Sequence, residues 1–222
     1  AIDPQILKRY LPCGTELDFF EETCYVSLVG FLFTDVKLHG ISIPFHTTFE
    51  EVNLRFYVRY KEGNHWKRGV VFLKEIVPRH AITFVANTLY NEKYATHPMR
   101  HAWQQENENL HIDYQWKVGR EWNYIKVRAD AASAPALAGS AEEFITEHYW
   151  GYTFIEANRS GTYQVAHPRW NIHAVKEHDI KCNATVLYGP QFATALAMEP
   201  CSVFLAAGSE IEVYKGQQIQ MA

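Results

Sequence analysis

The sequence lacks the patterns that mark membrane-bound, secreted and nucleic-acid-binding proteins. No apolar run approaches the roughly 20 residues that a transmembrane helix needs, and residues 1–10 lack the basic-then-apolar pattern of a secretory signal. The formal charge is −4, and no block of like charge is present. A basic patch is the usual footprint of a protein that binds nucleic acid or an anionic membrane. We therefore expect a cytoplasmic protein whose partners include neither a membrane nor nucleic acid.

Motifs for cofactors, metals and disulfides are also missing. There is no glycine-rich phosphate loop, no GxGxxG and no GxSxG. The four cysteines are Cys13, Cys24, Cys182 and Cys201. They form no CxxC pair, and four scattered cysteines in a chain of this length are typical of reduced thiols. Among eleven histidines, His97 and His101 have helical spacing but Pro98 lies between them, and zinc normally needs three or four ligands. We expect neither a cofactor nor a metal.

What the chain does contain is aromatic side chains and alternating strands. It has 222 residues, of which 47% are hydrophobic, with 13 Tyr, 13 Phe and 6 Trp. Aromatic and β-branched enrichment favours strands over a helical bundle, and the length suits one domain spanning residues 1–222. The sequence gives no indication of the oligomeric state.

Residues 51–60 form the clearest predicted strand, because apolar and polar residues alternate over ten positions. One face would carry Val52, Leu54, Phe56, Val58 and Tyr60, and the other Glu51, Asn53, Arg55, Tyr57 and Arg59. The turn at 62–64 predicts a hairpin with a partner strand at 69–76. Two further strands at 111–118 and 121–129 predict a second hairpin.

Helices are expected between these strands rather than in alternation with them. Helical spacing predicts a helix at about 79–90, and Ser140 with Glu143 forms a capping box ahead of a short helix. Short helices are also expected at 2–10 and 191–197, and short strands at 152–156, 162–166, 170–175, 183–188, 202–207 and 210–214. Strands in hairpin order with inserted helices predict an α+β fold with an antiparallel sheet. So many strands would leave exposed edges unless the sheet closes or doubles over.

The polar face of residues 51–57 has two interpretations. It could simply face water, since half-exposed antiparallel strands have this pattern. Alternatively, it could line the interior of a barrel. Because residues two apart on a strand are about 7 Å from each other, Glu51, Asn53 and Arg55 would form a row of acid, amide and cation. Arg55 could then bind a carboxylate in bidentate fashion, or the row could be satisfied internally as an Arg–Glu network.

Several motifs resemble the YqjF-like family of bacterial proteins, which is grouped with the acetoacetate-decarboxylase-like fold. The most distinctive is FEEVNLRFYV at 49–58. Others lie at 11–18, 25–29, 69–76, 90–94 (YNEKY), 98–100, 147–152 (EHYWGY) and 165–170. The resemblance covers nearly the whole chain. It implies a mostly antiparallel closed β barrel with a central, largely apolar cavity and a few short peripheral helices.

The same resemblance bears on the chemistry. Glu51 matches an active-site glutamate of the decarboxylases. Those enzymes form a Schiff base on a lysine whose pKa is depressed by an adjacent cation. Here residues 90–94 hold one lysine, Lys93, without a basic neighbour, and the resemblance places Tyr94 at the nucleophile position. Lys93 could still form an imine with a carbonyl substrate, or it could be an ordinary solvated lysine after a helix.

His148 also has two interpretations, as a general acid or base near Glu51 or as part of a packing cluster.

These candidate residues lead to two hypotheses for function. In the first, an enzyme acts on a small carboxylated or carbonyl compound, with Glu51 as acid or base and Arg55 as anion clamp. Asn53 and Tyr57 would orient the substrate. In the second, the same cavity serves a non-catalytic binding module for a small apolar or mixed ligand.

Overall fold

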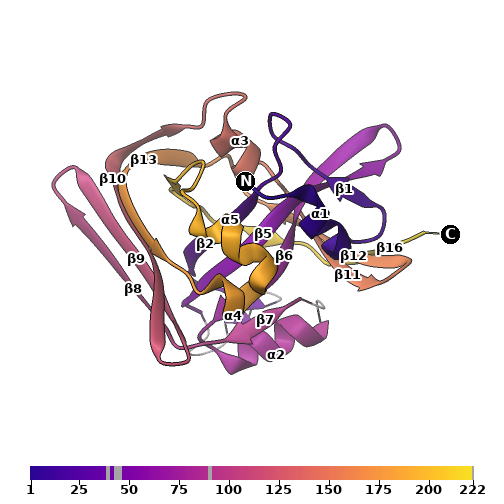
Figure 1. Ribbon diagram of the computed structural model, residues 1–222, viewed down its shortest axis with the longest axis horizontal. Helices are drawn as coiled ribbons and strands as arrows, with labels where there is room; N and C mark the ends of the chain where they lie inside the picture. The colour runs from indigo at the N-terminus through magenta and orange to yellow at the C-terminus, as the bar shows by residue number, and fades with distance from the viewer. Residues whose placement is uncertain (39–40, 43–46, 90–91, 222) are drawn as a thin grey trace.

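The structure is a computed structural model. It describes residues 1–38, 41–42, 47–89 and 92–221 (Figure 1). Its framework is a pair of sheets. The larger, nine-stranded sheet contains β1 (Thr15–Leu17), β2 (Val26–Phe33), β5 (Phe49–Glu62), β6 (His65–Val77), β7 (Tyr94–Thr96), β11 (Trp150–Glu156), β12 (Arg159–Ala166), β15 (Glu212–Val213) and β16 (Gln217–Gln220). The five-stranded sheet contains β8 (Met99–Glu106), β9 (Asn109–Val118), β10 (Glu121–Pro135), β13 (Asn171–Lys181) and β14 (Phe204–Ala206). A separate pair, β3 (Lys37–Leu38) and β4 (Ile41–Ser42), is also present.

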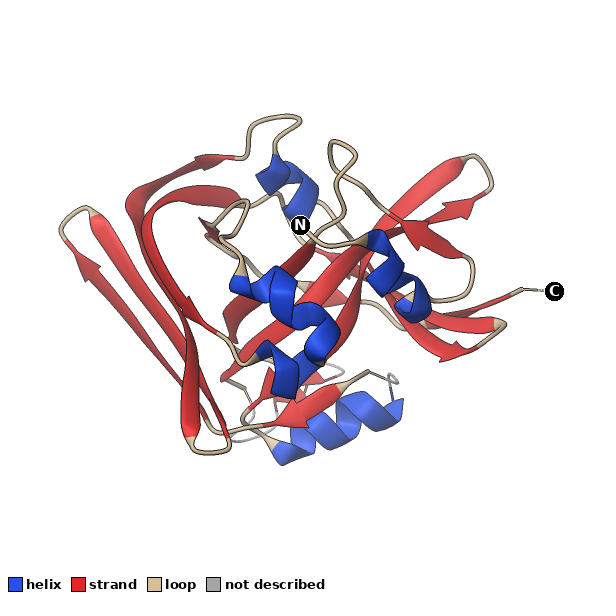
Figure 2. Ribbon diagram, in the orientation of Figure 1, coloured by secondary structure: helices blue, strands red, loops and turns tan. Residues whose placement is uncertain are grey.

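The strand order places β5 and β6 at the centre of the larger sheet. Its main path runs β1-β5-β6-β11-β12-β15, with β2 paired to β5, β7 to β6 and β16 to β12. Most neighbours are antiparallel, whereas β6 is parallel to both β7 and β11. The smaller sheet runs β14-β13-β10-β9-β8 and stands to one side of the larger one (Figure 2).

The predicted closed barrel was wrong: in the part of the chain that the structure describes, no sheet closes on itself. We predicted closure because open sheets would have exposed edge strands, but these edges are protected in other ways. β8 is an edge strand rich in polar side chains, and seven of its eight residues are exposed. The edge strand β15 has only two residues. Polar or very short edge strands prevent edge-to-edge association without closure.

The two sheets nevertheless pack against each other. Gly30 of β2 lies so close to Tyr114 of β9 that a Cβ added at residue 30 would be 3.2 Å from the tyrosine ring. The absence of a side chain at this position therefore permits the close approach of the sheets. Residues of both sheets, Gly30 and Tyr114 among them, also line a cavity.

The apolar face of β5 forms the centre of the hydrophobic core. Val52, Leu54, Phe56 and Val58 have no exposed surface. They belong to a cluster that also contains Leu7, Leu187 and Phe192, from segments that pack on this face. Burial of each such side chain is worth about 1.5–3 kcal/mol, so this cluster fixes which face of β5 turns toward the helices.

The helices are short and peripheral, as expected. They are α1 (Pro4–Leu7), η1 (Lys8–Tyr10), α2 (His80–Leu89), α3 (Ala141–Thr146), α4 (Ala184–Tyr188), η2 (Pro190–Phe192) and α5 (Ala193–Ala197). The predicted helix at 79–90 is α2, and residue 90 lies outside the described residues. The predicted capping box is present, because the Ser140 hydroxyl accepts a hydrogen bond from the backbone N–H of Glu143.

One local prediction was wrong, because the strand expected at 183–188 is the helix α4. The Asn183 side chain accepts a hydrogen bond from the backbone N–H of Val186 and so caps the helix. The side chain of Asn123 in β10 in turn accepts from the backbone N–H of Asn183. A long-range contact thus fixes the cap, which short-range β propensity could not reveal. No helix in the described residues has the length and apolarity required to cross a bilayer.

Candidate functional site

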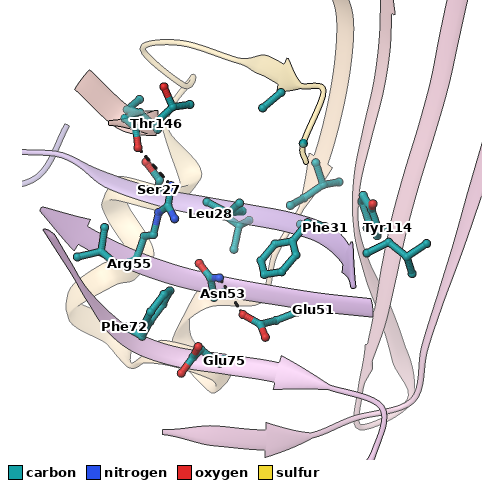
Figure 3. A pocket seen from close by; sticks show the side chains of 18 of the residues that line it. Ser27, Leu28, Phe31, Glu51, Asn53, Arg55, Phe72, Glu75, Tyr114 and Thr146 are labelled. Carbon is teal, nitrogen blue, oxygen red and sulfur yellow. Dashed lines mark hydrogen bonds between the residues drawn. The ribbon is translucent and has the colours of Figure 1, made fainter. Parts of the chain in front are cut away.

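The polar row of β5 does not face bulk water. Glu51 and Asn53 are each only 1% exposed, and Arg55 is half-buried. All three line a cavity of about 1970 Å³ whose wall includes residues of both sheets, such as Phe31 and Tyr114 (Figure 3). Because successive side chains on a strand point to opposite faces, burial of Val52 and Leu54 on one side turns this row into the cavity on the other.

Glu51 is held by two donors. The Asn53 side-chain amide donates to Glu51 Oε1 at 3.0 Å, and the Tyr94 hydroxyl donates to Oε2 at 3.0 Å. Strand pairing brings these groups together, since Asn53 is opposite Glu75 across β5 and β6, and Glu75 is opposite Tyr94 across β6 and β7. Glu75 is 3% exposed and also lines the cavity (Figure 3).

Glu92 and Tyr163, both half-buried, complete a carboxyl cluster with Glu51, Glu75 and Tyr94, and all five line the cavity. Burial raises the pKa of Glu51 to about 7, although hydrogen bonds from Asn53 and Tyr94 oppose the shift. Burial also raises the pKa of Glu92 to about 7.

The pKa of Glu75 lies well above its ordinary value because of burial and the charges of Glu51 and Glu92. Carboxyl groups with pKa values near neutrality can both donate and accept protons there. The cluster is therefore suited to proton transfer.

Close packing positions Tyr163 in this cluster. Gly151 on β11 is opposite Tyr163 on β12, and a Cβ at residue 151 would be 2.2 Å from the ring carbon Cζ of Tyr163. Any side chain at residue 151 would displace the tyrosine. Gly151 therefore leaves the space in which the Tyr163 phenol reaches the carboxyl groups.

Arg55 lies at the other end of the row and has no carboxylate partner among the described residues. One guanidinium nitrogen, Nη2, donates to the backbone carbonyl of Ile145 at a long 3.4 Å. The buried Nε has no partner within the described part of the chain. An unpaired cation in a cavity is a binding group for an anion, and a planar guanidinium matches a carboxylate well.

Tyr57 is 1% exposed and is not among the residues that line the cavity. Its hydroxyl is 2.6 Å from the Ser27 hydroxyl, and its ring centroid is 5.9 Å from Arg55 Cζ. Tyr57 therefore supports Arg55 and Ser27 from beneath the cavity wall.

His148 lines the cavity but pairs with Asp18, with Nε2 3.2 Å from Asp18 Oδ2. Its ring packs between Tyr57 and Phe144, at centroid distances of 4.8 and 4.9 Å. Burial lowers the pKa of His148. The imidazole therefore lies at the Arg55 end of the row, against Tyr57.

Lys93 is exposed and is not among the cavity-lining residues, and its ammonium is 5.6 Å from the ring centroid of Tyr10. Its neighbour Tyr94 turns into the carboxyl cluster instead. The remaining residues of the YNEKY motif that precede Glu92 lie outside the described residues. No group of three or more His, Cys, Asp or Glu side chains within the described residues has an arrangement that could hold a metal ion.

Sequence reasoning missed Glu75, Glu92, Tyr163 and Asp18. A signal existed for Glu75, since it is an acid in the mostly apolar end of a strand, FLKEIV at 72–77, where Lys74 is the other charged residue. No comparable local signal exists for Tyr163 or Asp18, because their positions depend on strand pairing and on contacts between distant segments.

Comparison with solved structures defines the fold class. The structure is similar to an acetoacetate decarboxylase from Legionella pneumophila, with a TM-score of 0.53 and 12% identity, over 99% of this chain and 78% of that one. It is also similar to the enduracididine biosynthesis enzyme MppR complexed with pyruvate. That match has a TM-score of 0.59 and 13% identity, over 98% of this chain and 79% of that one. At these identities the likeness establishes an acetoacetate-decarboxylase-like fold alone.

The sequence gives the particular family. The profile of the DUF2071 family, described as an uncharacterized conserved protein, matches residues 1–210, and the chain belongs to this family. It is 29% identical to the uncharacterized protein YqjF of Bacillus subtilis over 159 residues, which cover 68% of this chain. The aligned stretch spans 61% of the length of that relative. The resemblance inferred from the motifs is thus confirmed.

Proposed function

We propose that the protein is an enzyme that binds a small carboxylated carbonyl compound in the cavity and transfers a proton at the carbon next to its carbonyl group. The supporting observation is the pairing of opposite chemistries on one buried row. Arg55 supplies an unpaired cation, and Glu51 supplies a carboxyl group whose pKa is about 7. The structural neighbour MppR is complexed with pyruvate, which makes pyruvate a suitable probe for this chain.

In this proposal Arg55 binds the carboxylate of the ligand through charge-assisted hydrogen bonds. Glu51 then accepts a proton from the carbon next to the carbonyl group, and the electron pair of the broken C–H bond moves into an enolate. Return of a proton from Glu51 to that carbon regenerates the starting compound. Asn53 and Tyr94 hold the Glu51 carboxylate in place through both of its oxygens.

The binding step is tested by calorimetric titration with pyruvate. Hydrogen bonds to charged groups contribute about 1.5–3 kcal/mol, so Arg55→Met is expected to weaken pyruvate binding by about tenfold or more. Arg59→Met is the matched control, because Arg59 is on the same strand but pairs with Glu16 at the surface. Equal pyruvate affinity in the Arg55→Met variant and the wild type would refute the clamp.

The chemical step is tested by following exchange of the pyruvate methyl protons for deuterium in D2O by NMR. The wild type is expected to accelerate exchange above the rate in buffer, and Glu51→Gln to abolish the acceleration. Binding without exchange would favour the second function, a non-catalytic binding module. The position of Lys93 outside the cavity wall favours that alternative over imine chemistry.

We also propose a cytoplasmic location. All four cysteines are free thiols in the structure, which fits a reducing compartment.

A further inference from the structure

A second polar system lies at the Arg55 end of the cavity. Arg68 Nε donates to Asp18 Oδ2 at 2.6 Å, and the same oxygen is 3.2 Å from His148 Nε2. Asp18 is 5% exposed and His148 is 8% exposed. Burial alone would raise the pKa of Asp18, but hydrogen bonds from His148 and Arg68 outweigh it and leave the pKa below its ordinary value. The Asp18 side chain is therefore ionised at neutral pH.

This contact determines which nitrogen of His148 carries the proton. An ionised carboxylate has no hydrogen to donate, so His148 Nε2 is the N–H donor to Asp18. The Nδ1 atom of a neutral imidazole is then an acceptor with a free lone pair. Nδ1 is buried and has no partner among the described residues. A buried acceptor without a donor is rare and costly, so this atom calls for an explanation.

The surroundings of His148 indicate which kind of group would donate a hydrogen bond to Nδ1. The rings of His148 and Tyr57 have centroids 4.8 Å apart, and Arg55 Cζ is 5.9 Å from the same Tyr57 ring. Arg55 also donates to the carbonyl of Ile145, three residues before His148. Both Arg55 and His148 line the cavity. A cation for a carboxylate and an acceptor for a neutral donor thus lie against the same Tyr57 ring and in the wall of the same cavity.

We propose that His148 Nδ1 accepts a hydrogen bond from a hydroxyl group on the carbon next to the carboxylate that Arg55 binds. The cavity then prefers a 2-hydroxycarboxylate to the same acid without the hydroxyl. This inference rests on the proposed carboxylate site. Asp18 and Arg68 are positioning residues, because they fix the imidazole and touch no ligand. A hydroxyl fits better than an ammonium group, since Arg55 and Arg68 place two positive charges near the imidazole.

The first test is an NMR measurement of the His148 ring nitrogens in the ligand-free wild type at neutral pH. The expected result is a protonated Nε2 and an unprotonated Nδ1. A proton on Nδ1 would overturn the inference without any ligand or variant. In Asp18→Asn, the amide oxygen can still accept from both Arg68 Nε and His148 Nε2, so we expect the proton to stay on Nε2.

The second test compares lactate with propionate by calorimetric titration. One hydrogen bond of this kind is expected to make lactate bind about three- to tenfold more tightly than propionate. His148→Phe is expected to bring the ratio to about one while propionate affinity stays unchanged. His101→Phe, an imidazole outside the cavity wall, should keep the wild-type ratio.

Equal affinities of the wild type for the two acids would overturn this inference and leave the carboxylate site in place. Failure of both acids to bind would overturn the carboxylate site and the inference with it.

Discussion

Replacement of Glu51 by glutamine should make the folded protein more stable at pH 8. The substitution keeps the size of the side chain and removes its ionisation. Glutamine can still accept the hydrogen bond from Asn53 through its carbonyl oxygen and can donate to Tyr94 through its amide. The main change is therefore electrostatic, in a site where Glu51 is 1% exposed and close to Glu75 and Glu92.

The magnitude follows from the pKa of Glu51, which burial raises from 4.5 to about 7. The folded state binds this proton more tightly than the unfolded state. Its contribution to stability is fully present below about pH 4.5 and is lost as pH rises through about 7. At about 1.4 kcal/mol per pKa unit, ionisation of Glu51 in place costs roughly 3 kcal/mol. Glutamine does not titrate, so the variant avoids that loss.

Urea unfolding at pH 5 and pH 8 measures the effect. The variant should exceed the wild type by less than about 1 kcal/mol at pH 5 and by up to roughly 3 kcal/mol at pH 8. Glu108→Gln, an exposed carboxyl at the β8–β9 turn, should change stability by less than about 0.5 kcal/mol at both pH values. If Glu51→Gln were less stable than the wild type at pH 8, or if its effect did not depend on pH, the description of the carboxyl cluster would be refuted.

Two further predictions concern packing and covalent chemistry. Gly151→Ala should destabilise the protein by about 1–3 kcal/mol, because its Cβ would overlap the Tyr163 ring. Gly216→Ala, whose Cβ meets only ordinary contact at 3.4 Å, is the control in thermal unfolding, and equal effects would contradict the overlap. Borohydride reduction of the protein with pyruvate should leave Lys93 unmodified by mass spectrometry, since Lys93 is not part of the cavity wall. An adduct on Lys93 would show that the lysine reaches the ligand.

The local part of the fold could be predicted from the sequence because its signals are short-range. The alternation at 51–60 predicted β5, and burial of Val52 and Leu54 on one face with Glu51 and Asn53 in the cavity wall follows from it. The capping box at Ser140 is equally local. The prediction of a closed barrel was wrong because closure depends on which edge strands pair with each other. Such strands are far apart in the sequence, so local patterns do not reveal their pairing.

The candidate site could be predicted only in part, for the same reason. Glu51, Asn53 and Arg55 share one strand, so their common face was visible in the sequence. Tyr163 joins them through the pairing of β6 with β11 and of β11 with β12, and Glu92 lies two residues before β7, which pairs with β6. A single sequence does not reveal these pairings. The partnership of His148 with Asp18, 130 residues away, was likewise beyond local reasoning.

The most direct measurement is a crystal structure of the protein grown with pyruvate. We expect the ligand in the cavity between the two sheets, with its carboxylate oxygens about 3 Å from the Arg55 guanidinium. A structure in which Arg55 points into bulk water, or in which pyruvate binds away from the polar row of β5, would contradict the proposed site.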